Sequence, residues 1–240
     1  MTTKISHRHF EEIQSTQNFL KEEVANKKST DNILISTSKQ SNGIGRFGNK
    51  WDNFENSLAF SFSISATGKN LSILPLEIST ILVEWLKSKT GVSLRVKWPN
   101  DILTNHSQKC GGILCHYVSP KTIIAGIGLN YGPIEFNQNH LYKTSPGFVS
   151  HDIKLSEEDK KNLPLDFYNF FLQSISLKEN KLTFWESLCI HMNKKVKISH
   201  SDNNFKVGKF KGIGPNGEAL LELENKDLST FISGSLEILE

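Results

Sequence analysis

A change in the spacing of apolar residues restricts this chain to a fold that mixes strands and helices. Ser57–Ser65 (SLAFSFSIS) alternates apolar and polar side chains, as a half-buried strand does. Between Ile78 and Leu86 the apolar residues instead recur every three or four positions, which predicts an amphipathic helix that ends near Gly91. Two different periods within so short a stretch favour an α+β fold over an all-helical or all-strand fold.

Other segments complete the predicted elements. Ser15 and Thr16 carry side-chain hydroxyls typical of a helix N-cap, so a first helix is predicted after Ser15-Thr16-Gln17. Further strands are predicted over Asn32–Ser38, Leu94–Trp98, Gly112–Val118 and Thr122–Asn130, the last two as a hairpin. Tyr131–His151 is predicted to be a loop, and two more helices are predicted over Leu165–Leu177 and Leu182–Met192.

The pattern changes after Asn193. Short strands separated by polar turns, among them Pro215-Asn216-Gly217, predict a small β-barrel of about fifty residues. We therefore expect two units, a domain with a mixed or antiparallel sheet and helices over residues 1–192 and a β-barrel over residues 193–240.

Bulk composition narrows the function classes. The 28 Lys and Arg residues nearly balance the 25 Asp and Glu residues, for a net charge of +3. So small an excess of positive charge gives little support for a function in nucleic-acid binding. No apolar run approaches the ~20 residues of a membrane span, and the first residues lack the apolar core of a signal peptide, so we expect a cytoplasmic protein.

Cysteines and histidines offer no framework for disulfides or metal. Cys110, Cys115 and Cys189 are odd in number and have no close pairs, which indicates reduced thiols. His7 and His9 form an H-x-H pair without an accompanying cluster of Cys or carboxylate residues, so ordinary surface histidines are favoured over a zinc site. Metal ligands are left unassigned.

Residues 42–51 (NGIGRFGNKW) lie in a predicted loop, Gln40–Asn53. Its three glycines let the backbone approach a ligand closely, and exposed N–H groups in such a loop bind anions. Arg46 adds a permanent charge suited to carboxylate or phosphate, and Trp51 offers a stacking surface. A surface loop that ends in a buried tryptophan is an equal alternative, because short glycine motifs are common.

Two further motifs place charge near strand ends. Pro99 directs Asn100 and Asp101 away from a predicted strand, where Asp101 can orient an amine, accept its proton or hold a metal ion. An Asx turn is the alternative. Lys109 precedes Gly111 and places a cation beside a bare backbone, although an exposed hairpin lysine explains it equally.

Gly126 and Gly128 alternate along a predicted strand and therefore share one face. A flat ligand on that face would explain both glycines, and a bulge or tight packing is the alternative. Taken with the cations, these motifs predict carboxylate activation, in which an acid attacks the α-phosphate of ATP and a nucleophile then displaces AMP.

The chain resembles the biotin–protein ligases, also called biotin–[acetyl-CoA-carboxylase] ligases. The resemblance rests on Ser15-Thr16, QxxGxGRxGxxW (Gln40 to Trp51), KWPND (Lys97 to Asp101), KxGGIL (Lys109 to Leu114) and GIGLN (Gly126 to Asn130). It implies a class II synthetase-like catalytic fold with a C-terminal SH3-like β-barrel. It also implies an ATP- and Mg²⁺-dependent enzyme that forms biotinyl-5'-AMP and biotinylates a lysine of a biotin carboxyl carrier domain.

The resemblance implies roles for individual positions. Ser15, Thr16 and Gln40 would bind the ureido ring of biotin, and Gly43, Ile44 and Arg46 would frame it. Arg46 and Lys109 would handle the carboxylate and the phosphates, and Trp51, Asn100 and Asn130 would contact the nucleotide. Gly112, Gly126 and Gly128 would leave room for biotin, and Asp101 would help the acceptor lysine react, which makes Arg46, Asp101 and Lys109 the catalytic set.

Three positions depart from the family pattern. Ile44 stands where Arg is frequent, Gln17 stands where Asn is usual, and Asn49 stands where a basic residue is common. Because Ser15-Thr16 follows only fourteen residues, we expect no N-terminal DNA-binding domain and no direct DNA binding. No membrane partner is expected, and the protein is a monomer or a homodimer.

Two other functions stay open from the sequence. A lipoate or octanoate ligase or transferase shares the general catalytic fold, although GxGR and KWPND favour biotin. A non-catalytic biotin-binding module is the second alternative, and the intact set of Arg46, Asp101 and Lys109 argues against it.

Overall fold

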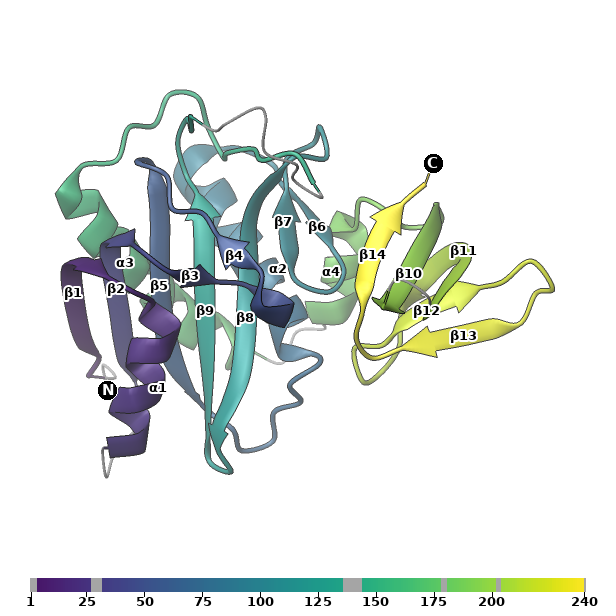
Figure 1. The fold of residues 1–240 in the computed structure, drawn as a ribbon, viewed down its shortest axis with the longest axis horizontal. Helices are drawn as coiled ribbons and strands as arrows, with labels where there is room; N and C mark the ends of the chain where they lie inside the picture. Colours follow the sequence, from purple (N-terminus) through teal and green to yellow (C-terminus); the bar gives the residue numbers. More distant parts are fainter. Residues whose placement is uncertain (1–3, 27–31, 136–143, 178–180, 202–203, 240) are drawn as a thin grey trace.

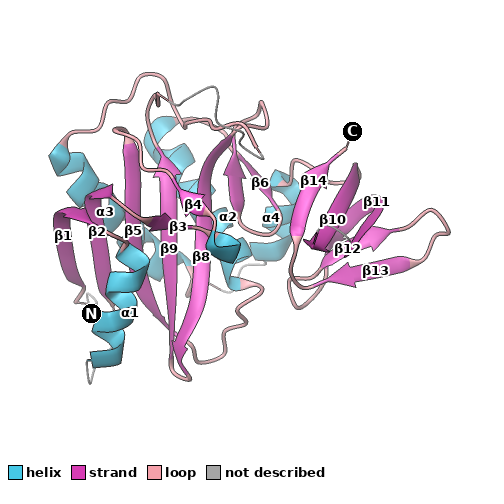
Figure 2. Ribbon diagram, viewed as in Figure 1, coloured by secondary structure: helices cyan, strands magenta, loops and turns pink. Residues whose placement is uncertain are grey.

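Two large β-sheets, a two-stranded hairpin sheet and four α-helices make up the computed structural model, which describes residues 4–26, 32–135, 144–177, 181–201 and 204–239 (Figure 1). The larger sheet occupies most of the molecule, and strands β10 to β14 form the smaller sheet at one end (Figure 2). None of the helices in these residues is long and apolar enough to cross a membrane.

The larger sheet has seven strands in the order β1-β2-β5-β9-β8-β7-β6. Only the pair β1 and β2 is parallel, and the other neighbours are antiparallel. In sheet order the strands are Ser6–Ile13, Ile33–Gln40, Ser57–Ser65, Thr122–Asn130, Lys109–Ser119, Asp101–Leu103 and Arg95–Lys97. The predicted strands and the hairpin of β8 and β9 are confirmed, whereas β1 and β7 were not predicted.

The helices divide between the two faces of this sheet. Helix α1 (Thr16–Asn26) packs Leu20 and Val24 on Ile33 and Ile35 of β2. The opposite face carries the main core and is covered by α2 (Leu74–Thr90), α3 (Glu157–Ser174) and α4 (Lys181–Leu188). The face under α1 is therefore covered by one helix, whereas the opposite face is covered by three.

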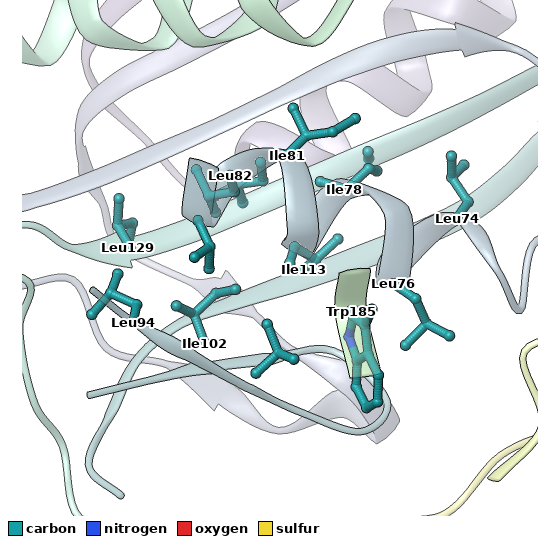
Figure 3. Close-up of a cluster of buried hydrophobic side chains, with 14 of the residues drawn as sticks. Leu74, Leu76, Ile78, Ile81, Leu82, Leu94, Ile102, Ile113, Leu129 and Trp185 are labelled. Atoms are coloured by element: carbon teal, nitrogen blue, oxygen red, sulfur yellow. The ribbon is translucent and has the colours of Figure 1, made fainter. Parts of the chain in front are cut away.

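Helix α2 fixes the main core. Its apolar stripe packs against β8 and β9 through Ile113 and Leu129, and Trp185 of α4 joins the same cluster (Figure 3). Each fully buried Leu or Ile side chain contributes about 1.5–3 kcal/mol. Gly91 ends the helix in the left-handed conformation, with φ 71°, as its position after the last periodic residue predicts.

Two helices differ in their bounds from the prediction, and α3 also ends at Ser174 rather than Leu177. Helix α3 begins at Glu157, well before the predicted Leu165, because Ser156 and Asp159 form a reciprocal capping box. Pro164 lies inside the helix and made the earlier turns look non-helical. Helix α4 ends at Leu188 rather than Met192, since the chain then pairs Cys189 with Val96 of β6.

The smaller sheet is antiparallel, in the order β13-β12-β11-β10-β14. The strands β10 to β14 are Lys195–Ser201, Asn204–Ile213, Ala219–Glu222, Leu228–Phe231 and Ser235–Ile238. Register shifts in β10 and β11 bend it, but β13 and β14 each pair on one side only, so the predicted barrel is an open, curled sheet. The division of the chain at residue 193 stays a proposal, and it falls between α4 and β10.

Candidate active site

A strip of mostly small residues crosses the sheet on the face that α1 covers. Asp101 pairs with Gly112, Gly112 with Gly128, and Gly128 with Ala59 across β7, β8, β9 and β5. Directly opposed residues project to the same face of a sheet, and Gly126 shares that face because it lies two residues from Gly128. The name "trough" denotes here the strip formed by these five residues, four of which are glycine or alanine.

One end of the trough lies under the start of α1. Thr16 donates hydrogen bonds to Gln40 Oε1 from its backbone N at 2.9 Å and from Oγ1 at 3.1 Å. Ser15 is 3% exposed, and its hydroxyl accepts a 3.4 Å hydrogen bond from the backbone of Asn18. The structure thus brings together Ser15, Thr16 and Gln40, which the sequence motifs place at the same site.

Gln17 lies at the same end and was not among the predicted site residues. It is 6% exposed, and Ser61 Oγ donates to its Oε1 at 2.9 Å. A Cβ added at Gly126 would overlap that oxygen. Tight packing against Gln17, the alternative considered for the sequence, therefore explains Gly126 in the ligand-free protein, and only the position of Gln17 after Ser15-Thr16 hinted at it.

Trp51 covers the middle of the trough. The predicted loop is a small hairpin in which β3 (Gly43–Ile44) pairs with β4 (Lys50–Trp51). A Cβ added at Gly128 would lie 2.5 Å from Trp51 Nε1 and 2.8 Å from its Cζ2, so the indole rests directly on that glycine. The Nε1 atom is buried and has no hydrogen-bond partner among the described residues. Such an unpaired donor is costly to bury.

Charged residues converge at the other end. Lys109 Nζ lies 2.6 Å from Asp101 Oδ1 and 5.5 Å from the centre of the Trp51 ring. Arg46 Nη1 donates to Asn100 Oδ1 at 3.3 Å and to the Gly234 carbonyl at 3.2 Å. Burial lowers the pKa of Arg46 while the charge of Asp101 raises it, and a guanidinium stays protonated throughout. The three predicted catalytic residues therefore lie together.

Lys97 is a further cation at this end that the predicted set omitted. It pairs across strands with Asp101, and the two side chains share a face. Burial lowers the pKa of Lys97, and the charge of Asp101 opposes that effect. Its signal in the sequence was its place at the start of KWPND, four residues before Asp101.

The two asparagines of the nucleotide-binding set make internal hydrogen bonds. Asn130 Nδ2 donates to the Gly147 carbonyl at 2.9 Å, and its Oδ1 accepts from Ser57 Oγ at 3.1 Å. Asn100 Nδ2 donates to the Ile113 carbonyl at 2.7 Å. Both carboxamides therefore fix local backbone at the edge of the site. Ile44 lies in β3, half-buried, and Asn49 at the tip donates to the Arg46 carbonyl at 2.8 Å.

A hollow of about 830 Å³ lies elsewhere, between β1, β2 and the start of α3. Two of the charges along it, Lys160 and Glu157, form an ion pair at 2.8 Å. His9 bonds Ser36 and Ser38 at 2.9 and 3.1 Å, so the H-x-H pair belongs to this polar packing rather than to a metal site. Within the described part of the chain, no three His, Cys, Asp or Glu residues are grouped to hold a metal ion. The trough, with its converging cations, is the better candidate site.

The arrangement of sheet, helices and smaller sheet is that of the biotin protein ligases. The Aquifex aeolicus biotin protein ligase in complex with biotin and ATP superposes with a TM-score of 0.76 at 24% identity, covering 97% of this chain and 99% of that one. The Helicobacter pylori biotin acetyl coenzyme A carboxylase synthetase gives a TM-score of 0.68 at 22% identity, covering 95% of this chain and 100% of that one. At such identities the likeness establishes the fold.

Sequence comparison establishes the family. The model of the Biotin/lipoate A/B protein ligase family matches residues 9–130, and the chain belongs to that family. It is 25% identical over 236 residues to the bifunctional ligase/repressor BirA of Bacillus subtilis, an alignment that covers 90% of this chain and 69% of that protein. The matched segment contains α1, the Gly43–Trp51 hairpin and the whole trough.

Proposed function

We propose that this protein is an ATP-dependent ligase that activates biotin as biotinyl-5'-AMP and transfers it to a lysine of a biotin carrier domain of the acetyl-CoA carboxylase type. The observation that carries the proposal is the trough itself, with a polar end at Thr16 and Gln40 and a cationic end at Arg46 and Lys109. Biotin has a polar ring head and a carboxylate tail, and the two ends of the trough match these two groups in order.

In the first step the carboxylate oxygen of biotin attacks the α-phosphorus of ATP, and pyrophosphate leaves. Arg46, Lys97 and Lys109 balance the charge that builds up on the phosphate oxygens, because fixed cations in a water-poor site stabilise such charge strongly. Lys109 is paired with Asp101 in the structure, so binding of phosphates draws it away from that carboxylate.

In the second step the amine of the acceptor lysine attacks the acyl carbon, and AMP leaves. Asp101, released from Lys109, accepts the proton of the incoming ammonium and orients the amine, which is work suited to a carboxylate at the edge of the site. The same side chain therefore pairs with Lys109 before the phosphates bind and acts as a base during transfer. Specificity for a carrier domain is part of the proposal, and the acceptor is unidentified.

Magnesium fits this arrangement as a companion of ATP. Mg²⁺ is bound in many nucleotide sites by one or two carboxylates together with the phosphates. Asp101 lies at the cationic end and is suited to be such a ligand, and the metal would add further positive charge at the phosphates. Arg46 and Lys109 are assigned to binding and orienting the phosphates, whether or not the metal contacts Asp101.

The deciding experiment is pyrophosphate exchange into ATP, with biotin, lipoate and octanoate offered separately. We expect exchange with biotin alone. Exchange with lipoate or octanoate but not with biotin would support the alternative ligase or transferase, and absence of exchange with every acid would support the binding module. Asp101→Asn separates the two steps, since it should retain exchange and lose transfer to a carrier domain.

A further inference from the structure

Strand β1 lies at one edge of the larger sheet and is held by few contacts (Figure 1). In the described part of the chain it pairs with β2 alone, and none of its eight residues is buried. Arg8 and Phe10 face α1, and His7 and His9 alternate with them and face α3. An edge strand with so little buried surface opens locally at low cost, so the contacts of the two histidines decide how firmly it is held.

The two imidazole rings hold β1 through a row of hydrogen bonds, called here the histidine ladder (His7, Ser36, His9, Ser38 and Glu157). His7 Nε2 and His9 Nδ1 lie 2.8 and 2.9 Å from Ser36 Oγ, and His9 Nε2 lies 3.1 Å from Ser38 Oγ. Ser38 Oγ donates to Glu157 Oε2. The ladder therefore runs from the edge strand across β2 to the first residue of α3.

The hydrogens of the ladder follow from the fact that each hydroxyl has one to donate. Ser38 gives its hydrogen to the Glu157 carboxylate, so His9 Nε2 donates to Ser38. A neutral His9 then has a bare Nδ1, which accepts from Ser36, and Ser36 accepts from His7 Nε2. Every hydrogen in the ladder has an acceptor while His9 is neutral.

A proton added to His9 disrupts this order. Its Nδ1 then carries a hydrogen that points at Ser36 Oγ, and the Ser36 hydroxyl loses its acceptor in the ladder although Ser36 is 0% exposed. A buried donor without a partner is costly. A ring that has moved into water has no such cost, so protonation favours release of the strand.

The charges around the two rings also oppose protonation. Burial, His9 and Lys161 lower the pKa of His7 from 6.5 to about 4, in that order of size. Burial also lowers the pKa of His9, while Glu157 opposes this effect and Lys161 and Lys160 add to it. The charged side chains along the adjoining hollow come from β1, β2, the loop before β5 and α3, and are Glu11, Lys39, Glu55, Glu157, Glu158, Lys160 and Lys161.

We propose that β1 is a proton-sensitive strap, which the histidine ladder holds on the sheet at neutral pH and which is released when the two rings are protonated. The strap leads directly into α1, since the Gln14 carbonyl accepts from the backbone N–H of Asn42 at 2.9 Å and Ser15 and Thr16 follow at the polar end of the trough. Acid therefore loosens the first turn of α1 together with β1. The strap acts in this way whether or not the protein uses biotin.

His7 sets a minimum size for the effect. Its pKa is about 4 on the sheet and 6.5 off it, so between pH 7.5 and pH 5 the equilibrium shifts toward release about 30-fold through His7 alone. Because the pKa is lowered on the sheet, the stabilisation is present above 6.5 and is lost as the pH falls toward 4. His9 shifts the equilibrium in the same direction.

Hydrogen exchange of backbone amides tests the strap, because exchange reports the local opening equilibrium. We expect the protection of β1 and of the first turn of α1, corrected for intrinsic rates, to fall about 30-fold or more between pH 7.5 and pH 5, beyond any loss in β5 and β9. A loss no greater than that in β5 and β9 overturns the proposal. A β1 that is unprotected at pH 7.5 overturns it as well, and loss in β1 without loss in α1 refutes the coupling to the trough.

The double variant His7→Gln with His9→Gln removes the titration and keeps side chains that can bond Ser36 and Ser38. We expect its β1 protection to change less than about threefold over the same pH range, and a persistent 30-fold change would assign the effect to other groups and overturn the strap. His106→Gln is the matched control, because His106 is exposed in the turn between β7 and β8, and it should keep the wild-type dependence. If the double variant does not fold, Ser36→Ala takes its place. It removes the hydroxyl that joins the two rings, so β1 protection should fall about tenfold already at pH 7.5, and unchanged protection overturns the proposal.

Discussion

Gly128→Ala and Gly112→Ala provide a matched pair of substitutions in the trough. The two glycines lie directly opposite each other on β9 and β8. At Gly128 an added Cβ would lie 2.5 Å from Trp51 Nε1, whereas at Gly112 the nearest atoms are Lys109 Cε at 3.5 Å and Trp51 Cζ3 at 3.6 Å. Ordinary contacts between carbon atoms are about 3.5–4.0 Å, so the first change displaces the indole by roughly 1 Å and the second leaves it in place.

Stability should change little in either variant. Overpacking costs typically about 1–3 kcal/mol, and the value for Gly128→Ala should fall at the low end, because Trp51 belongs to a short hairpin that can shift. Its indole Nε1 also has no hydrogen bond to lose within the described structure. Alanine is otherwise tolerated on a strand, so the effect is confined to the trough.

Tryptophan emission measures the displacement. Trp85, Trp98 and Trp185 are each 1% exposed and should emit alike in all variants, so subtracting the spectrum of a Trp51→Phe version of each protein isolates Trp51. We expect a red shift of Trp51 emission in Gly128→Ala and none in Gly112→Ala. Both methyl groups narrow the trough, so both variants should lose at least about tenfold in biotin-dependent exchange.

The outcome that refutes this reasoning is unchanged Trp51 emission together with normal biotin use in Gly128→Ala. That result would mean that neither the indole nor the acid lies against this glycine. Normal biotin use in Gly112→Ala alone would confine the acid to the β9 side of the trough.

Four further predictions follow from the geometry. Lys109→Ala should lower biotin-dependent exchange at least about 100-fold, while urea unfolding shows a loss of about 1 kcal/mol or less, and unchanged exchange would contradict its role. Asp101→Asn should slow transfer to a carrier domain about 100-fold or more in a single-turnover assay that starts from biotinyl-5'-AMP, and equal rates would argue against a base at that position. Burial lowers the pKa of His191 from 6.5 to about 3. Between these values the unfolded chain binds a proton at this histidine and the folded protein does not, so the free energy of unfolding should fall as the pH drops from 6.5 toward 3. In urea unfolding, the free energy of unfolding of His191→Phe should depend less steeply on pH, by up to the equivalent of one bound proton. An equal dependence in both proteins would show that His191 is protonated in the folded state. Chymotrypsin should cut after Phe47, which is 72% exposed, more slowly with biotin and ATP than without them, and equal rates would argue against ordering of the hairpin.

Local patterns were enough to predict much of this fold. Strand β5 matches its predicted bounds because its alternation is uninterrupted, and α2 was found from one apolar stripe and the stop at Gly91. Asp101 and Lys109 were expected at one site from the motifs KWPND and KxGGIL, and their side chains lie 2.6 Å apart. In each case the information lies within a few residues of the chain.

The parts that escaped prediction depend on partners far away in the sequence. Strand β1 is largely polar, and its histidines are satisfied only by Ser36 and Ser38 on β2. Gln17 and Lys97 join the site because of what lies across from them, Gly126 and Asp101 respectively. The contact between Trp51 and Gly128 requires the hairpin to fold back over the sheet. No spacing of neighbouring residues in the sequence encodes that arrangement.

The hydrogen bond from Arg46 to the Gly234 carbonyl joins residues 188 positions apart. At a synthesis rate of about 5–20 residues per second, Arg46 waits roughly 10–40 s for this partner after it is made. The hairpin that carries Arg46 is thus held by a segment that is translated long after it. A growing chain can complete its larger sheet long before Gly234 is synthesised. Its hairpin would still lack the hydrogen bond from Arg46 to the Gly234 carbonyl. Synthesis of the segment around Gly234 therefore sets the earliest time at which the Arg46 side chain can take the position seen in the structure.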